Sequence, residues 1–147
     1  MSLITNSKVT LDYEILERFE AGVKLIGIEA KSVRAKHGNL QGAYIIIRGS
    51  EVYLKNAFIP PYQENNTPKE YDAYRERKLM LNMREIAELS KAEQTKGLTV
   101  VPLSMYNKGR NIKVDIAIVR GKKKFDKRQT LKKRTTEREI QREFSDR

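Results

Sequence analysis

In this sequence, the residues whose types and spacing point to a particular chemistry are basic side chains. They lie beside aromatic or amide side chains. Arg75, Arg77 and Lys78 follow Tyr71 and Tyr74. Basic groups bind phosphates, and aromatic rings stack on unpaired bases. The combination therefore favours nucleic-acid binding, although a loop that packs its tyrosines onto the protein body gives the same pattern.

The same combination occurs twice more along the chain. Three basic residues of the segment 31–36 precede Asn39, and Lys124 precedes Phe125. Glu29 is an exception to the basic trend. Its carboxylate is suited to accept a hydrogen bond from guanine or to orient a neighbouring cation, and an ion pair within the protein is the alternative.

No combination of residues predicts catalysis. The sequence has no cysteine and a single histidine, His37, which excludes thiolate metal sites, a cysteine nucleophile and a histidine-rich metal site. Gly109 and Gly121 are isolated, so there is no glycine-rich phosphate loop. We therefore expect no enzyme activity, no metal and no cofactor.

The positive charge is concentrated at the C-terminal end. The chain has 147 residues and a formal net charge of +11. Residues 120–147 contain 12 basic and 5 acidic residues, a net of +7, whereas residues 1–119 contain 18 and 14, a net of +4. A basic segment attached to a more balanced body predicts an arm that binds a polyanion. A solubilising tail is the alternative.

Length and hydropathy indicate one compact domain. No apolar run exceeds the five residues 43–47, and the N-terminus lacks the basic and apolar pattern of a secretory signal. We therefore expect a cytoplasmic protein that does not enter a membrane.

The first half of the chain has mainly strand patterns. Residues 1–10 are expected to form a flexible lead-in, residues 20–22 a tight turn and residues 29–36 a helix. Gly49-Ser50 is a two-residue hairpin signal. The predicted strands are residues 13–19, 23–28, 43–48 and 51–59.

The second half begins with a polar segment, residues 62–76, which is expected to be a long exposed loop. Asn82 and Glu85 have the spacing of a capping box, and Gly97 is a stop signal, so a helix is predicted between them. Residues 99–106 and 111–120 are predicted strands.

Six short strands without a repeated strand-helix-strand unit favour a mainly β fold. We expect a closed antiparallel barrel with two or three short helices, and the OB-fold is the candidate because it often binds nucleic acid. Residues 1–120 would form this domain.

Residues 121–147 would form a basic tail with helix propensity but almost no apolar face. A helix would stack Arg134, Arg138 and Arg142 on one side, where like charges repel. A phosphate backbone would turn this repulsion into attraction. We expect a tail that is disordered when free and helical on RNA.

Four segments in order resemble the SsrA-binding protein (small protein B, SmpB) family over nearly the full chain. They are residues 12–40, which include Gly27, Glu29, Lys31, Ser32 and Arg34, and the stretches RERKLML, KGLTVVPL and RGKKKFDKR. Phe125 stands where the family often has Tyr or His, so it keeps a stacking ring but has no polar group.

The resemblance implies a function in bacterial trans-translation. It implies an OB-fold that binds the tRNA-like domain of transfer-messenger RNA (tmRNA, SsrA RNA). It also implies a tail that enters the small-subunit decoding centre and empty mRNA channel of a stalled ribosome, where it contacts ribosomal RNA. Elongation factor Tu would deliver alanyl-tmRNA with this protein, which is expected to be a monomer. An OB-fold RNA chaperone or ribosome-associated factor that does not use tmRNA is the alternative.

The resemblance also assigns residues. The expected tmRNA face consists of Lys8, Glu29, Lys31, Arg34, Lys36, Asn39, Arg75, Arg77 and Lys78. The expected hinge into ribosomal RNA is Gly121, Lys122, Lys123 and Lys124. Phe125, Asp126, Lys127 and Arg128 are expected at the decoding centre, and Lys132, Lys133, Arg134, Arg138 and Arg142 along the channel.

Overall fold

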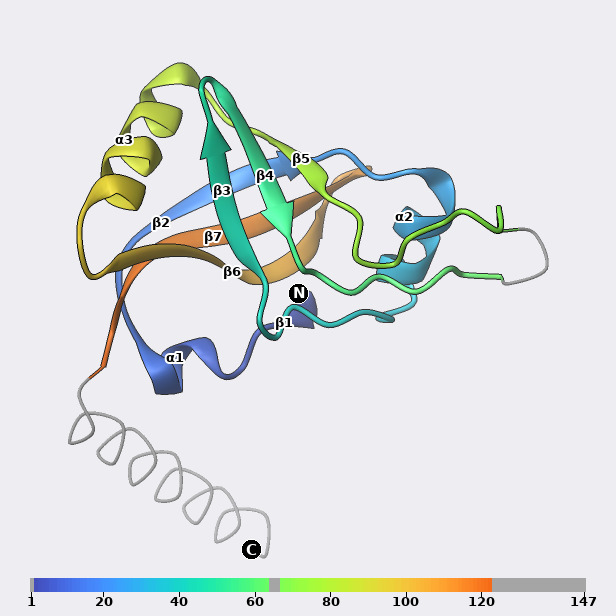
Figure 1. Ribbon diagram of the computed structural model, residues 1–147. Helices are drawn as coiled ribbons and strands as arrows, with labels where there is room; N and C mark the ends of the chain where they lie inside the picture. Colours follow the sequence, from blue (N-terminus) through green and yellow to red (C-terminus); the bar gives the residue numbers. More distant parts are fainter. Residues whose placement is uncertain (1, 64–66, 123–147) are drawn as a thin grey trace, which may run out of the picture.

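The computed structural model describes residues 2–63 and 67–122, which form one sheet with helices packed around it (Figure 1). The strands are β1 (Ser2–Thr5), β2 (Tyr13–Val23), β3 (Tyr44–Arg48), β4 (Glu51–Lys55), β5 (Arg77–Met80), β6 (Leu98–Lys108) and β7 (Asn111–Gly121). The helices are α1 (Val9–Asp12), α2 (Gly27–Arg34) and α3 (Met83–Gln94). Within these residues, no helix is long and apolar enough to cross a membrane.

The sheet is antiparallel and has the strand order β1-β6-β7-β2-β5-β4-β3. The mainly β class is therefore confirmed. Closure of the barrel is not, because no ladder in the described residues joins the two edge strands β1 and β3.

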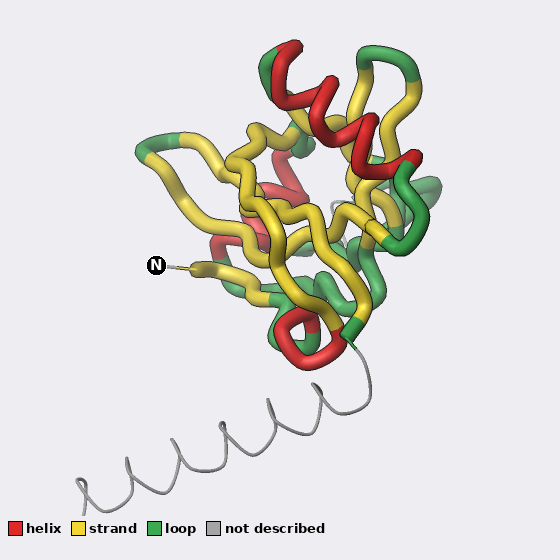
Figure 2. Tube along the Cα trace, turned by 90° about the vertical axis from the view of Figure 1, so that its left-hand side faces the viewer, coloured by secondary structure: helices red, strands yellow, loops and turns green. Residues whose placement is uncertain are grey.

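Helix α3 gives a physical reason for the open edge. It packs against both β6 and β3, and Figure 2 shows it lying across the strands. The Ile47 N–H of the edge strand β3 donates to Glu93 Oε2 of α3 at 2.9 Å. A helix side chain thus satisfies a backbone group that a further strand would otherwise satisfy.

The core lies inside the curved sheet. Ile112, Val114, Ile116 and Ile118 of β7 alternate into it, as predicted. The C-terminal half of β7 is also covered on its other face, where Val119 packs in a second small cluster with Val9 of α1.

The prediction of a flexible lead-in was wrong. β1 pairs with β6, and Ile4 is buried in the core. The buried Asn6 side chain donates to Leu40 O at 3.2 Å and Pro102 O at 3.1 Å. These contacts are with distant segments, which explains why local sequence patterns did not indicate them.

The turn expected at residues 20–22 and the strand expected at 23–28 were also wrong. β2 continues to Val23, and Gly22 pairs with Lys113. A Cβ atom at Gly22 would lie 3.0 Å from Met80 Cε, the flexible end of a half-exposed side chain, so Gly22 is an ordinary strand residue here and not part of a turn. Helix α2 begins at Gly27, inside the predicted strand.

The polar segment before β5 is not simply an exposed loop. Its described part is attached to the body, because the Ile59 N–H donates to Ala73 O at 3.0 Å. The Phe58 and Tyr74 rings also pack at a centroid distance of 5.2 Å. β5 was not predicted, because four residues are too few for a clear period.

The predicted N-cap of α3 is confirmed. Asn82 Oδ1 accepts from the Glu85 N–H at 2.8 Å, and Glu85 Oε1 accepts from the Asn82 N–H at 3.2 Å. Replacing Asn82 by Ala should lower the free energy of unfolding by about 1 kcal/mol, because the Glu85 N–H loses its side-chain acceptor. Urea denaturation measures this value, and a Lys96→Ala variant, altered just beyond the helix, is the control. Equal stabilities of the two variants would contradict the capping role.

Candidate nucleic-acid interface

Helix α2 presents basic side chains to solvent at one end of the long strands. Lys31 and Arg34 of α2, and Lys36 two residues beyond its end, are all exposed. Arg34 Nη2 donates to Arg110 O in the β6–β7 turn at 2.8 Å, which fixes the helix against that turn. The two lysines have no carboxylate partner in the described residues, so their charges are available to phosphates.

Glu29 lies on the inner face of the same helix and is completely buried. The Arg75 guanidinium pairs with its Oε1, and Arg77 Nη2 lies 2.6 Å from its Oε2. Glu29 Oε1 also accepts from the Ile26 N–H at 3.0 Å, at the start of the helix. The Tyr71 hydroxyl oxygen lies 3.2 Å from Oε2. One carboxylate therefore joins α2 to the segment before β5.

The electrostatics of Glu29 follow from these contacts. Burial acts to raise its pKa, but hydrogen bonds from Arg75, the Ile26 N–H and Arg77 outweigh it. The pKa of Glu29 is therefore below its ordinary value, and the side chain is ionised at neutral pH.

Arg77 is the second fully buried charge of this cluster. Its Nη1 donates to Ala57 O at 2.7 Å and its Nη2 to Ala73 O at 2.9 Å. The Tyr71 hydroxyl also donates to Ile59 O at 2.7 Å. Two backbone segments on either side of residues 64–66 are thus held by the same cluster.

Burial corrects the predicted RNA face. Glu29 and Arg77 have no exposed surface, so direct contact with RNA is inconsistent with their positions. Arg75 is only about one-third exposed and is committed to Glu29. The structure instead assigns these three side chains a supporting position beneath α2, which was the alternative for Glu29.

The other predicted residues occupy different places. Asn39 is exposed, and its Oδ1 accepts from the Gln41 N–H at 2.8 Å. Lys78 on β5 forms a partly exposed ion pair with Glu51 at 3.4 Å. Lys8 is exposed next to α1, where it lines a groove together with Tyr13. Lys8 therefore does not belong to the α2 surface.

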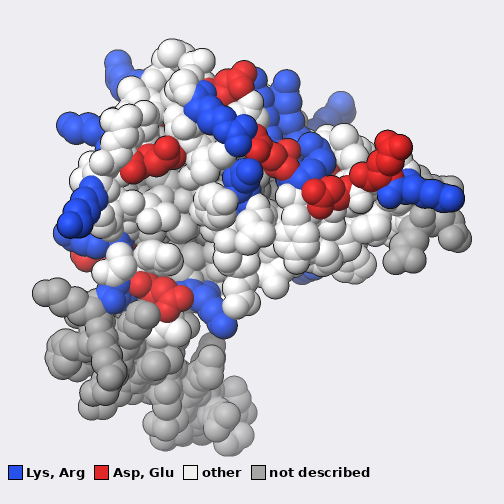
Figure 3. All heavy atoms as spheres, viewed as in Figure 1, with Lys and Arg blue, Asp and Glu red and all other residues white. Residues whose placement is uncertain are grey.

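Charges of both signs cover the face over the β3–β5 strands. Figure 3 shows blue and red spheres interleaved there. Glu76 accepts from Arg48 at 2.9 Å and from Lys55 at 3.3 Å. Because carboxylates neutralise these cations, this face is a weaker phosphate surface than α2.

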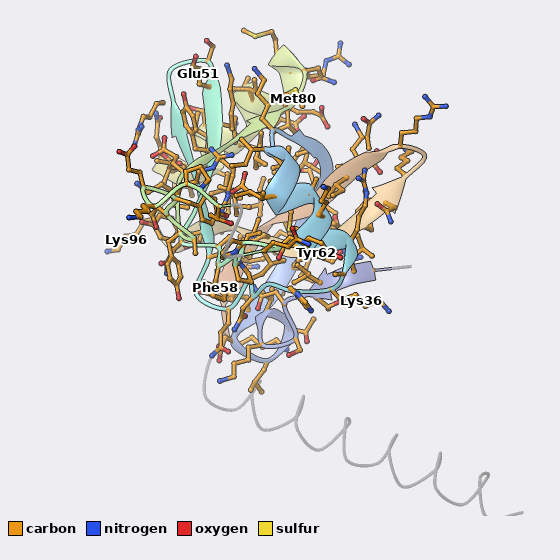
Figure 4. The ribbon with its side chains drawn as sticks, turned by 90° about the vertical axis from the view of Figure 1, so that its right-hand side faces the viewer. Lys36, Glu51, Phe58, Tyr62, Met80 and Lys96 are labelled. Carbon is orange, nitrogen blue, oxygen red and sulfur yellow. The ribbon has the colours of Figure 1, made fainter. Side chains whose placement is uncertain are left out.

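The sequence reasoning did not identify a further exposed patch beside α2. Met80 is 48% exposed and Ile26 is 45% exposed. Lys113 lies close to Met80, because a Cβ atom placed at Gly22 would lie 3.6 Å from Lys113 Nζ and 3.0 Å from Met80 Cε. Figure 4 shows Met80 above α2 and Lys36 near its lower end, with Lys96 at the opposite edge. An exposed apolar side chain next to a cation suits a base and its phosphate.

Glu20 extends this patch along β2. Lys108 Nζ donates to it at 2.8 Å, and the Tyr106 hydroxyl donates to its other oxygen. Hydrogen bonds from Lys108 and Tyr106 lower the pKa of Glu20. Burial, with the bond to Glu20, raises the pKa of Tyr106 well above its usual range. The strand alternation of β2 was the signal that could have placed Glu20 outward.

The chain leaves the described fold at the other end of β7. Gly121 pairs with Tyr13, and Lys122 donates from its N–H to Asp12 O at 2.9 Å and from Nζ to Thr10 O at 2.7 Å. These two residues are held against β2 and α1 in this structure, and their expected role as part of a hinge stays a prediction. Lys123, Lys124 and the rest of the tail, for which the sequence predicts a hinge and ribosomal contacts, lie outside the described residues.

The cationic α2 end and the point where the basic C-terminal segment of the sequence begins are therefore separated by the length of one strand. Arg34 contacts the turn that precedes β7, and Lys122 follows its end. Eleven residues of extended chain span roughly 35 Å. In residues 2–63 and 67–122, no group of three His, Asp or Glu side chains could hold a metal ion.

Comparison with known proteins gives consistent relatives. A family model described as SmpB protein matches residues 3–146. The SsrA-binding protein of Synechococcus sp. (strain JA-2-3B'a(2-13)) is 44% identical over 99% of this chain and 95% of the relative. That of Microcystis aeruginosa (strain NIES-843 / IAM M-2473) is 47% identical over 88% and 84%, and that of Clostridium tetani (strain Massachusetts / E88) is 40% identical over 99% and 93%.

A solved structure gives the same result at the level of the fold. A chain of "tmRNA-SmpB: a journey to the center of the bacterial ribosome" superposes with a TM-score of 0.69 and 37% sequence identity. The similarity covers 86% of this chain and 92% of that chain. Sequence and fold thus agree, and the chain belongs to the SmpB family.

Proposed function

We propose that this protein is the RNA-binding adaptor of trans-translation. It binds the tRNA-like domain of tmRNA and delivers alanyl-tmRNA to stalled ribosomes. The observation that carries this proposal, together with family membership, is the separation of two cationic regions by the length of β7. An adaptor must contact two large RNAs at once, and opposite ends of a rigid sheet allow both contacts.

The tmRNA face in this proposal is the α2 end of the molecule. Lys31, Arg34 and Lys36 bind phosphates, and Met80 with Lys113 contacts an unstacked part of the RNA. Glu29, Arg75 and Arg77 hold this surface in place without touching the RNA. Asn39 and Lys78 stay at its margin.

The ribosomal face is the opposite end, in an OB-fold domain of residues 1–120. The tail, residues 121–147, enters the decoding centre and the empty mRNA channel and becomes helical on RNA. Its basic clusters neutralise phosphates, and Phe125 supplies a stacking ring. An intact message would occupy the same channel, which restricts the protein to stalled ribosomes.

The remaining parts of the proposal concern partners. The protein acts as a monomer in the cytoplasm, and elongation factor Tu carries alanyl-tmRNA together with it. It has no catalytic role, since binding and positioning account for the whole of its task. An RNA chaperone that does not use tmRNA is the competing function, and RNA that co-purifies with the protein distinguishes the two.

Salt dependence tests the α2 surface. Replacing Lys31 by Gln should weaken tmRNA binding and reduce the slope of log K against log salt by about one unit, because one phosphate contact is lost. Filter binding over a series of salt concentrations measures the slope. Lys96→Gln is the matched control, since Lys96 is exposed at the opposite edge (Figure 4). Equal slopes for both variants would remove Lys31 from the interface.

A further inference from the structure

A groove beside α1 has no part in the function proposed above. Its volume is about 530 Å³, and it lies between α1, the start of β2, residues 41–44 and β6. The side chains that matter for its chemistry are Asn6, Lys8, Asp12, Tyr13, Gln41 and Tyr44. Sites for small organic groups typically have volumes of roughly 300–1,000 Å³, so the groove has the size of a ligand site.

Two aromatic rings line this groove. Tyr13 is the first residue of β2 and is half-buried, and Tyr44 is the first residue of β3 and is 41% exposed. Neither hydroxyl has a hydrogen-bond partner in the described part of the chain. A tyrosine with an open ring and an unused hydroxyl is suited to a flat ligand that has polar edges.

Polar groups of three kinds surround the rings. Lys8 supplies a cation on an exposed side chain, Gln41 supplies an amide that donates and accepts, and Asp12 supplies a carboxylate. A nucleobase presents ring nitrogens, carbonyls and exocyclic amino groups at its edges, and its phosphate requires a cation. An apolar peptide would offer no hydrogen-bond partner to the Lys8 ammonium or the Gln41 amide.

The walls of the groove are built before any ligand arrives. Buried Asn6 bridges Leu40 O and Pro102 O, which fixes one wall to β6. Asn56 Nδ2 donates to Gly42 O at 3.2 Å, and Gly42 has a φ of +79°, which favours glycine. A preformed groove loses little conformational entropy on binding.

We propose that this groove binds one unstacked nucleotide of an RNA, with the base against Tyr44 and Tyr13 and the phosphate at Lys8. The groove and the anchor of Lys122 share α1, because Lys122 contacts Asp12 O and Thr10 O. The nucleotide therefore binds where the chain leaves the fold, away from α2. This inference rests on the proposed function in one respect, which is that the RNA supplying the nucleotide is ribosomal RNA or tmRNA.

Amide NMR of the full chain tests the groove directly. Titration with adenosine 5′-monophosphate should give saturable shifts at residues 41–44 and at Thr99. Tyr44→Ala should bind at least about ten-fold more weakly, because one stacking face is lost. Tyr44→Phe should keep most of the affinity. Tyr62→Ala, which removes an exposed ring outside the groove, is the matched control and should bind like the unchanged protein.

Two results would overturn the proposal. One is the absence of shifts at the groove. The other is equal affinity for ribose 5-phosphate, which lacks a base, because phosphate attraction to a basic protein would then explain the binding. Measurement of tmRNA affinity on the same sample separates the two proposals: nucleotide binding without tmRNA binding contradicts the adaptor function alone, and the reverse contradicts the groove alone.

Photo-crosslinking identifies the source of the nucleotide. A photoreactive amino acid at position 44 of the full chain is irradiated once with tmRNA and once with small ribosomal subunits. A crosslink to either RNA supports the proposal and assigns the source. A crosslink to protein only would overturn it.

Discussion

Replacing Glu29 by Gln is expected to lower the free energy of unfolding by about 3–5 kcal/mol. The reason is that the variant leaves the buried guanidinium of Arg77 without its counter-ion, and a buried charge that loses its partner is strongly destabilising. Chemical denaturation followed by circular dichroism measures the change. A neutral Gln cannot compensate, because it supplies one oxygen where the carboxylate supplies two acceptors.

Lys31→Gln is the matched control for this variant, because Lys31 lies on the exposed side of the same helix. Its stability should stay within about 0.5 kcal/mol of the unchanged protein. Similar stabilities of the Glu29→Gln and Lys31→Gln variants would show that Glu29 is not the structural centre of this end. At a temperature where the Glu29→Gln variant stays folded, it can still bind tmRNA more weakly. That weaker binding would arise from displacement of the α2 surface.

The pH dependence of stability provides a second readout for Glu29. Its folded pKa is below the unfolded value of about 4.3, so its stabilisation is fully present above that pH. The stabilisation is lost as the pH falls through the folded pKa. Stability of the unchanged protein should therefore approach that of Glu29→Gln under acidic conditions. A difference that stays constant to the lowest pH would contradict a depressed pKa.

Ending the chain after Lys122 should abolish the tagging of stalled peptides while tmRNA binding survives. The removed segment contains ten basic and five acidic residues, a net of +5. The α2 surface lies at the other end of β7 and is left intact. Reconstituted trans-translation measures tagging, and filter binding measures affinity for tmRNA.

The position of the cut is decisive for this experiment. A chain that ends after Val119 also loses the Gly121 pairing with Tyr13 and the contact of Lys122 with Asp12. That shorter chain should be less stable, so its failure would not report on the tail. A broad loss of RNA affinity by the chain that ends after Lys122 would favour an RNA chaperone over the adaptor.

Features of the fold that depend on neighbouring residues were predictable from sequence. The hairpin at Gly49 joins β3 and β4, with Arg48 opposite Glu51. The Asn82 cap and the alternation along β7 are also present. In each case the stabilising groups are close in sequence or repeat with a fixed period.

Features that depend on distant residues were missed. β1 is short and is recognisable only through its pairing with β6, more than 90 residues away along the chain. Gly22 resembles a turn residue, but it pairs with Lys113 of β7 and with Met80 of β5. The ring of Tyr44 indicates a ligand groove only because Tyr13 and Lys8 are brought beside it.

The sequence by itself determined the mainly β class, the excess of positive charge at the C-terminal end and the resemblance to the SmpB family. Tertiary structure alone decided which charges are available to RNA. Arg77 and Lys31 are both basic residues, yet Arg77 is buried against a carboxylate 48 positions away and Lys31 faces solvent. Burial and ion pairing act through space, so the same residue type binds phosphate at one position and neutralises a buried carboxylate at another.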